Sequence, residues 1–120
     1  MAEIKISELS IGDWARVNGV TTKVWYLSED GEVNDTTYDW VEPIPLTAEI
    51  LEKNGFRKNG EYNEWNIGTW ETPYLLGVSL ERPAITIKWN GSSIFIDQAR
   101  YVHQLQHALR LAGVVKEIEV

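Results

Sequence analysis

The sequence has no cysteine among its 120 residues, which excludes disulfide bonds and thiolate metal sites. It also lacks any apolar run near the roughly 18 to 20 residues that a membrane-spanning helix needs. Its first residues, MAEIKISE, do not show the basic and then apolar layout of a signal peptide. Together these absences predict a cytoplasmic protein that does not span a membrane.

Basic residues are also few, with 11 Lys and Arg against 18 Asp and Glu, and a net charge of -7. General nucleic-acid binding requires a basic face, so this balance argues against it. Acidic residues gather in residues 29–42, which contain no Lys or Arg. We interpret this segment as a solvated loop and strand face. A calcium site is the alternative, but the segment lacks the ligand spacing and closing Glu of an EF-hand.

Asparagine-glycine pairs indicate the fold. Between alternating apolar runs such a pair predicts a β-hairpin, because both residues tolerate the positive φ of a type I′ turn. Three pairs have this setting, namely Asn18-Gly19, Asn59-Gly60 and Asn90-Gly91. The sequence therefore predicts a single α+β domain over residues 1–120, built mainly of antiparallel hairpins. The first hairpin is similar to the start of a small SH3-like barrel.

One short and one longer helix are expected beside these hairpins. Thr47 is a good N-cap for the short helix, and Gly55 suits the left-handed position that ends it. The longer helix is predicted between Asp97, which can cap it, and Gly113. Residues 114–120 are rich in β-branched side chains and predict a final edge strand.

Two histidines in the longer helix, His103 and His107, have the four-residue spacing of a helical zinc site. A helical wheel places them with Arg100 and Arg110 on the side opposite the apolar face, toward solvent. A catalytic zinc site is not expected, because Gln104 replaces the general-base glutamate and the chain has no third His. We therefore expect no metal and no cofactor.

These four residues leave three interpretations open: a plain solvated helix face, a stripe that binds an anion or a partner, and a weak metal site. Arginine presents a planar fork of donors that suits phosphate or carboxylate. Histidine adds donors that depend on pH. Such a stripe suits a nucleotide-like ligand or an acidic surface, for example residues 29–42 of a second copy in a homo-oligomer.

The sequence contains six tryptophans, and a small domain cannot easily bury all of them. Trp65, Trp70 and Tyr74 are candidates for a platform that stacks on bases or sugar rings, although each ring alone can instead complete the core. Glu61 and Glu64 lie near these rings and suggest sugar hydrolysis. In a strand, however, residues 61 and 64 point to opposite faces. No nucleophile or phosphate-loop motif is present, so we do not expect an enzyme.

Three stretches carry a resemblance: "IGDWARV" at residues 11–17, "IPLTAEILEKNGF" at 44–56 and "YVHQLQHALRLAG" at 101–113. They are similar, in order, to a family of small uncharacterised proteins from gut anaerobes and their phages. This chain departs from the family pattern at His107, where Asn is common, and in the Leu-Arg-Leu-Ala-Gly that ends the helix. The resemblance implies a phage or mobile-element origin and no particular activity.

The predicted function is a non-enzymatic small binding protein that sequesters an anionic, nucleotide-like ligand. The expected ligand-binding residues are Arg100, His103, His107, Arg110, Trp65, Trp70 and Tyr74. The alternative is a protein-interaction module that binds a host or phage partner through a sheet edge or an aromatic patch. A metal-dependent or carbohydrate-processing enzyme is the remote alternative.

Overall fold

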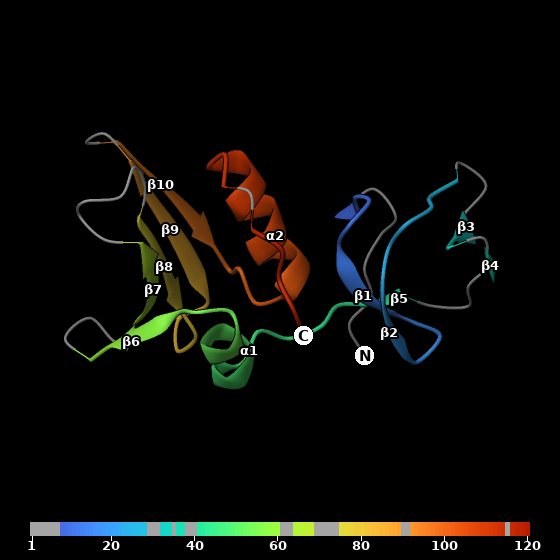
Figure 1. Ribbon diagram of the computed structural model, residues 1–120, viewed down its shortest axis with the longest axis horizontal. Helices are drawn as coiled ribbons and strands as arrows, with labels where there is room; N and C mark the ends of the chain where they lie inside the picture. The colour runs from blue at the N-terminus through green and yellow to red at the C-terminus, as the bar shows by residue number, and fades with distance from the viewer. Residues whose placement is uncertain are drawn as a thin grey trace. The chain divides into compact units, whose positions relative to one another are not determined.

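The structure is a computed structural model, and it describes residues 8–28, 32–34, 36–37, 41–60, 64–68, 75–89, 92–114 and 116–120. The predicted α+β class, with antiparallel hairpins and one short and one longer helix, is confirmed (Figure 1). The chain divides into an N-terminal unit, Met1–Pro45 with Tyr101–His103, and a C-terminal unit, Leu46–Arg100 with Gln104–Val120. The single domain over residues 1–120 stays a prediction. No helix of the described residues is long and apolar enough to cross a membrane.

The N-terminal unit contains a three-stranded antiparallel sheet in the order β2-β1-β5. Its strands are β1 (Trp14–Val17), β2 (Val20–Lys23) and β5 (Val41–Glu42). Asn18 and Gly19 join β1 to β2 with φ values of 48° and 84°. Positive φ at both positions is what a type I′ turn requires, so the first predicted hairpin is confirmed.

A second, two-stranded sheet in this unit pairs β3 (Glu32–Val33) with β4 (Thr36–Thr37). The two sheets share an apolar cluster of Leu9, Ala15, Val17, Val24, Val33 and Val41, with Leu27 packed against it. Only an isolated bridge, between Leu27 and Val33, extends the two-stranded sheet. The described strands therefore form no closed barrel, and the expected SH3-like barrel is not seen in them.

The C-terminal unit is built on a five-stranded antiparallel sheet in the order β10-β9-β8-β7-β6. Its strands are β6 (Arg57–Asn59), β7 (Glu64–Gly68), β8 (Leu75–Ser79), β9 (Ala84–Trp89) and β10 (Ser92–Asp97). Strands that are neighbours in the sequence are neighbours in the sheet, so this is a meander. The predicted hairpins around residues 59–60 and 90–91 are confirmed, since β6 pairs with β7 and β9 with β10. The expected two-residue turn at Asn59-Gly60 is wrong, because Asn59 belongs to β6 and pairs with Glu64.

One face of this sheet is apolar and forms the core of the unit. Its buried side chains are Trp65, Leu76, Val78, Ile85 and Ile87. Helix α2 (Val102–Leu111) lies along one side of the sheet (Figure 1) and contributes buried Leu105, Ala108 and Leu109. Because side chains alternate along a strand, the residues between these apolar ones point to the opposite face.

The short helix α1 (Ala48–Lys53) has the ends that the sequence predicts. The Oγ1 atom of Thr47 accepts a hydrogen bond from the N–H of Ile50 at 3.2 Å. After the helix, Gly55 has a φ of 87°, and the N–H of Phe56 donates to the carbonyl of Leu51 at 3.0 Å. This is the left-handed helix end in which a following apolar residue folds back on the last turn.

The predicted edge strand at the C-terminus is wrong for residues 116–120, which form no strand. The side chain of Asn54 forms hydrogen bonds with the N–H and the carbonyl of Glu119, which a strand would use for pairing. Its Nδ2 atom donates to the carbonyl of Glu119 at 2.7 Å, and the N–H of Glu119 donates to its Oδ1 atom at 2.8 Å. Nδ2 also donates to the carbonyl of Ile50 at 2.7 Å. The last residues are thereby attached to α1, with Ile118 buried.

Candidate binding site

The structure corrects the expectation that His103 faces solvent, because its side chain is only 4% exposed. The ring of His103 stacks on that of Tyr101, with centroids 6.0 Å apart. The backbone around it is also occupied, since Tyr101 pairs with Pro45 and the N–H of Val102 donates to the carbonyl of Ile44. A wheel considers one helix alone, whereas this first turn also lies beside residues 44–45.

Of the remaining members of the predicted stripe, His107 and Arg110 lie three residues apart on α2 and are therefore neighbours on the helix surface. Arg100 and Arg110 are exposed, and His107 is half-buried. Arg110 lies in the last turn of α2, whereas Arg100 precedes the helix, and buried His103 stands between them in the sequence. Gln104, which replaces the zinc-site glutamate, has a local role: its Oε1 atom accepts the N–H of Arg100 at 2.7 Å. This bond satisfies a backbone donor just before the helix.

The predicted aromatic platform of Trp65, Trp70 and Tyr74 loses Trp65, which is buried. Trp65 is only 8% exposed and lies on the apolar face of the sheet, so its ring completes the core. Trp70 and Tyr74 lie outside the described residues. In the described part of the chain, no group of three or more His, Asp or Glu side chains is placed to hold a metal ion.

The face of the five-stranded sheet opposite the apolar one carries a different set of side chains. One register row crosses four strands, from β7 to β10, through Asn66, Gly77, Thr86 and Phe95. The next row contains Ser79, Ala84 and Asp97. Glu64 on β7 stands beside Ser79, because Trp65, which follows Glu64, pairs with Val78, which precedes Ser79, in the antiparallel ladder.

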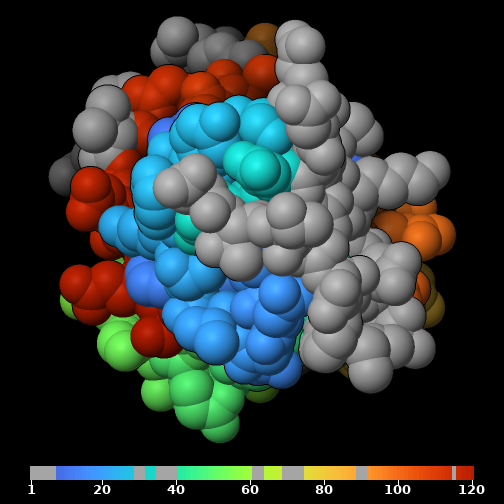
Figure 2. Space-filling view, turned by 90° about the vertical axis from the view of Figure 1, so that its right-hand side faces the viewer, coloured from blue at the N-terminus to red at the C-terminus, as the bar shows by residue number. Residues whose placement is uncertain are grey.

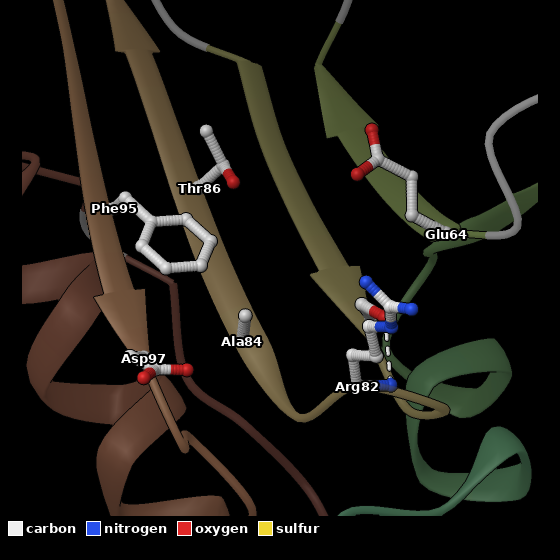
Figure 3. A pocket seen from close by; sticks show the side chains of 7 residues that line it. Glu64, Arg82, Ala84, Thr86, Phe95 and Asp97 are labelled. Carbon is white, nitrogen blue, oxygen red and sulfur yellow. Dashed lines mark hydrogen bonds between the residues drawn. The ribbon is translucent and has the colours of Figure 1, made fainter.

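Side-chain size along these rows creates a hollow. Within these two rows the middle strands, β8 and β9, present only small side chains, whereas the outer strands β7 and β10 present larger ones. The resulting cavity has a volume of ≈ 440 Å³, and its lining is Glu64, Ser79, Arg82, Ala84, Thr86, Phe95 and Asp97 (Figure 3). We call this cavity the trough. Its walls are about 14 Å apart between backbones, which is three inter-strand spacings of about 4.8 Å.

Gly77 lies under the carboxylate of Glu64. A Cβ atom added to Gly77 would come within 2.9 Å of Cδ, Oε1 and Oε2 of Glu64. The Nδ2 atom of Asn66 donates to Oε1 of Glu64 at 3.2 Å and to the carbonyl of Leu76 at 3.3 Å. The half-buried carboxylate is therefore held against the sheet by an amide on its own strand, in the space that a glycine leaves.

The opposite wall of the trough is formed by Phe95 and Asp97 on β10 (Figure 3). The ring of Phe95 is 66% exposed, a large fraction for an aromatic side chain. Arg82 follows β8 in the turn that leads to β9, and its N–H donates to Oγ of Ser79 at 3.3 Å. Two carboxylates and one guanidinium give the trough a net negative charge.

Sequence reasoning missed this face, although two signals in the sequence indicate it. Gly77 interrupts an otherwise apolar strand, and an interior strand glycine often marks a close approach. Phe95 alternates with Ile94 and Ile96, which belong to one face, so its ring must lie on the other. Glu64 was considered only together with Glu61, which lies outside the described residues.

A second exposed aromatic group lies in the N-terminal unit, whose surface is seen in Figure 2. Trp25 is 61% exposed, and its ring centroid is 6.1 Å from that of Tyr26. The Oδ1 atom of Asn34 accepts the N–H of Trp25 at 2.7 Å, and its Nδ2 atom donates to the carbonyl of Lys23 at 2.8 Å. Asn34 thus fixes the backbone that presents the ring.

In comparisons with known proteins, no protein family, no curated protein and no solved structure matches the chain. The resemblance to small proteins of gut anaerobes and their phages stays a prediction. The trough and the exposed rings are therefore the features on which a function can be based.

Proposed function

We propose that the protein is a non-enzymatic binding protein, and that a partner protein docks on the trough of the C-terminal unit. The observation that carries this proposal is the 66% exposure of Phe95 at the wall of a cavity of ≈ 440 Å³ on the sheet face opposite the apolar one. Phenylalanine is enriched in protein interfaces, and an exposed ring beside polar groups gains most from being covered.

The position of Phe95 in the sheet supports a protein partner. Strand β10 is the end strand of the five-stranded sheet, so alternate residues direct backbone N–H and C=O groups away from β9. Its six residues include no Lys, Arg or Pro, the residues that commonly block edge pairing. A partner that covers Phe95 can therefore also form backbone hydrogen bonds along β10.

The charges of the trough favour a protein partner over a small anionic ligand. Glu64 and Asp97 both line the trough, and each repels phosphate or carboxylate groups. Arg82 is the single basic residue of the lining. The protein as a whole carries a charge of -7, which adds to the repulsion of anions at low salt.

The proposal is tested by affinity capture with the wild type, Phe95→Ser and Leu111→Ser. Leu111 is a matched control, because it is 62% exposed on α2 and does not line the trough. We expect that the wild type and Leu111→Ser recover the same partner, and that Phe95→Ser binds the purified partner about tenfold more weakly or worse. Equal affinity of all three proteins would contradict the proposal.

Sequestration of an anionic, nucleotide-like ligand is the second candidate function. It is favoured by the exposure of Arg100 and Arg110, which keep guanidinium groups at the surface of an acidic protein. A thermal shift with a mixture of nucleoside mono-, di- and triphosphates tests it, since a ligand of the folded state raises the midpoint of unfolding. A shift in the wild type that disappears in the Arg100→Ala, Arg110→Ala double variant would support this candidate.

We further propose a cytoplasmic setting in a phage or mobile element and a homo-oligomer as an alternative assembly. The location is supported by the cysteine-free composition, which suits a reducing compartment, and the phage setting by the resemblance. The oligomer is supported by the opposite charges of Arg100, Arg110 and the acidic segment at residues 29–42. Native mass spectrometry measures the copy number directly, and a monomer at micromolar concentration would refute the oligomer.

A further inference from the structure

The carboxylate of Glu64 is held in place before any partner binds. It lies over Gly77, where a side chain would leave no room for it. It accepts one hydrogen bond from Asn66, and within the described residues this is the bond that restrains it. In Figure 3 it points away from Arg82, so the nearest guanidinium of the trough does not take up its charge. A fixed, half-buried carboxylate with acceptor capacity left is prepared to bind a donor cation.

Asp97 brings a second carboxylate to the facing wall, in the register row to which Ser79 and Ala84 belong. Small side chains occupy the floor between the two acids, so a long side chain can enter without displacing bulky groups. The hydroxyls of Ser79 and Thr86 provide further acceptors there. The lining keeps a net negative charge with Arg82 counted, although Oδ1 of Asp97 already accepts the N–H of Gln98 at 3.0 Å. An anionic group would therefore be repelled, whereas a cation would be attracted by both carboxylates.

Phe95 completes the recognition of a cation. Its exposed ring lies on the same wall as Asp97 and faces the trough (Figure 3). Aromatic faces attract cations, and arginine does this more often than lysine because its guanidinium is planar and weakly hydrated. The same planar group can form two parallel hydrogen bonds to one carboxylate.

We infer that the trough is a receptor for an arginine side chain of the partner, with Glu64 as the fixed carboxylate acceptor. Asp97 supplies the second charge, and Phe95 covers the apolar stem and the face of the guanidinium. Gly77 and Asn66 are positioning residues, since they act through Glu64. This inference rests on the proposed function, because it names the chemistry by which the docked partner is recognised.

The test is a titration of ¹⁵N-labelled protein with the blocked tripeptide acetyl-Gly-Arg-Gly-amide. The matched probe replaces arginine with citrulline, whose neutral urea group has nearly the same shape. We expect saturable shifts of the Gly77 and Thr86 amide signals with the arginine peptide, and none with the citrulline peptide. Added salt should weaken binding, since screening acts on partly exposed charges.

Two variants with the same loss of charge separate Glu64 from the general acidity of the protein. Glu64→Gln keeps the size of the side chain and should weaken binding about two- to fivefold, the change that corresponds to a partly exposed ion pair. Glu52 is exposed on α1, outside the trough, so the Glu52→Gln variant should bind as the wild type does. Gly77→Ala should resemble Glu64→Gln, because the new Cβ displaces the carboxylate.

Each adverse result has a separate meaning. Equal shifts with citrulline, or equal affinity in Glu64→Gln and Glu52→Gln, would overturn the arginine receptor. The proposed function would still stand if partner capture depends on Phe95. If capture does not depend on Phe95 while the arginine peptide still requires Glu64, the docking proposal fails and the cation site remains. No shift at Gly77 or Thr86 with any peptide would refute the inference.

Discussion

Replacing Asn54 should detach the last residues of the chain from helix α1. Asn54 is 5% exposed and follows α1 directly. Its side chain makes three hydrogen bonds, one with the carbonyl of Ile50 and two with the backbone of Glu119. In Asn54→Ala the N–H and the carbonyl of Glu119 lose this partner, and the side-chain constraint that keeps Ile118 in the core is removed. The carbonyl of Ile50 still accepts the backbone N–H of residue 54 at 3.2 Å.

The magnitude follows from the three bonds. Each buried hydrogen bond contributes roughly 0.5–1.5 kcal/mol net, so their loss costs about 1.5–4.5 kcal/mol. Ile118 is 1% exposed, and complete detachment would add roughly 1.5–3 kcal/mol of lost burial. Water replaces some of these bonds if the segment leaves the surface. We therefore expect Asn54→Ala to lower the free energy of unfolding by about 2–4 kcal/mol.

Urea denaturation followed by tryptophan fluorescence measures this free energy. The control is Glu119→Ala, because Asn54 bonds to the backbone of Glu119 and the exposed side chain is not involved. That variant should stay within about 0.5 kcal/mol of the wild type. Asn54→Asp keeps the acceptor for the N–H of Glu119 but loses both donors, and should also destabilise. A change below about 0.5 kcal/mol in Asn54→Ala would refute the reasoning.

Further predictions concern the core, the helix surface and the sheet glycine. Leu105→Ala should cost roughly 2–5 kcal/mol in urea unfolding, because Leu105 is fully buried in α2, and a near-neutral result would contradict its place in the core. Arg100→Ala should stay within about 0.5 kcal/mol in the same measurement, as expected for an exposed side chain, and a loss of several kcal/mol would show that this end of α2 is covered. Gly77→Ala should fold, with a thermal midpoint near that of the wild type, because its Cβ meets only the end of the Glu64 side chain, which can rotate away once its bond to Asn66 breaks. Failure to fold would show that the carboxylate cannot shift.

Local signals predicted the elements of the fold well. Asn18 and Gly19 adopt the positive φ that their turn needs, whatever surrounds them. Thr47 and Gly55 mark the ends of α1 through bonds within a few residues of sequence. The alternation of Ile85 and Ile87 with Thr86 predicted which side chains of β9 share a face. In each case the structure depends on residues that are close together in the chain, so a short segment of sequence is enough to predict it.

The candidate site was predicted much less well. The wheel placed His103 in solvent because it considered α2 alone, and the neighbouring residues 44–45 come from far away in the chain. Trp65 was considered for a platform, yet pairing with Val78 places its ring in the core. The alternation of Ile94 and Ile96 around Phe95 was visible in the sequence. The exposure of Phe95 could not be predicted from this alternation, because it depends on which face of the sheet is covered.

The sequence by itself determined the hairpins, the ends of α1 and the acidic, cysteine-free character of the protein, because propensity, turn chemistry and charge are properties of short segments. The expected cap of the longer helix was wrong, since Asp97 ends β10 and α2 begins at Val102. Only the tertiary structure decided which residues form a surface. The trough brings together Glu64, Gly77 and Phe95 from three strands, and the register of four strands places them in adjacent rows. Strand register is set by the joint burial of many side chains, so no single segment could reveal it.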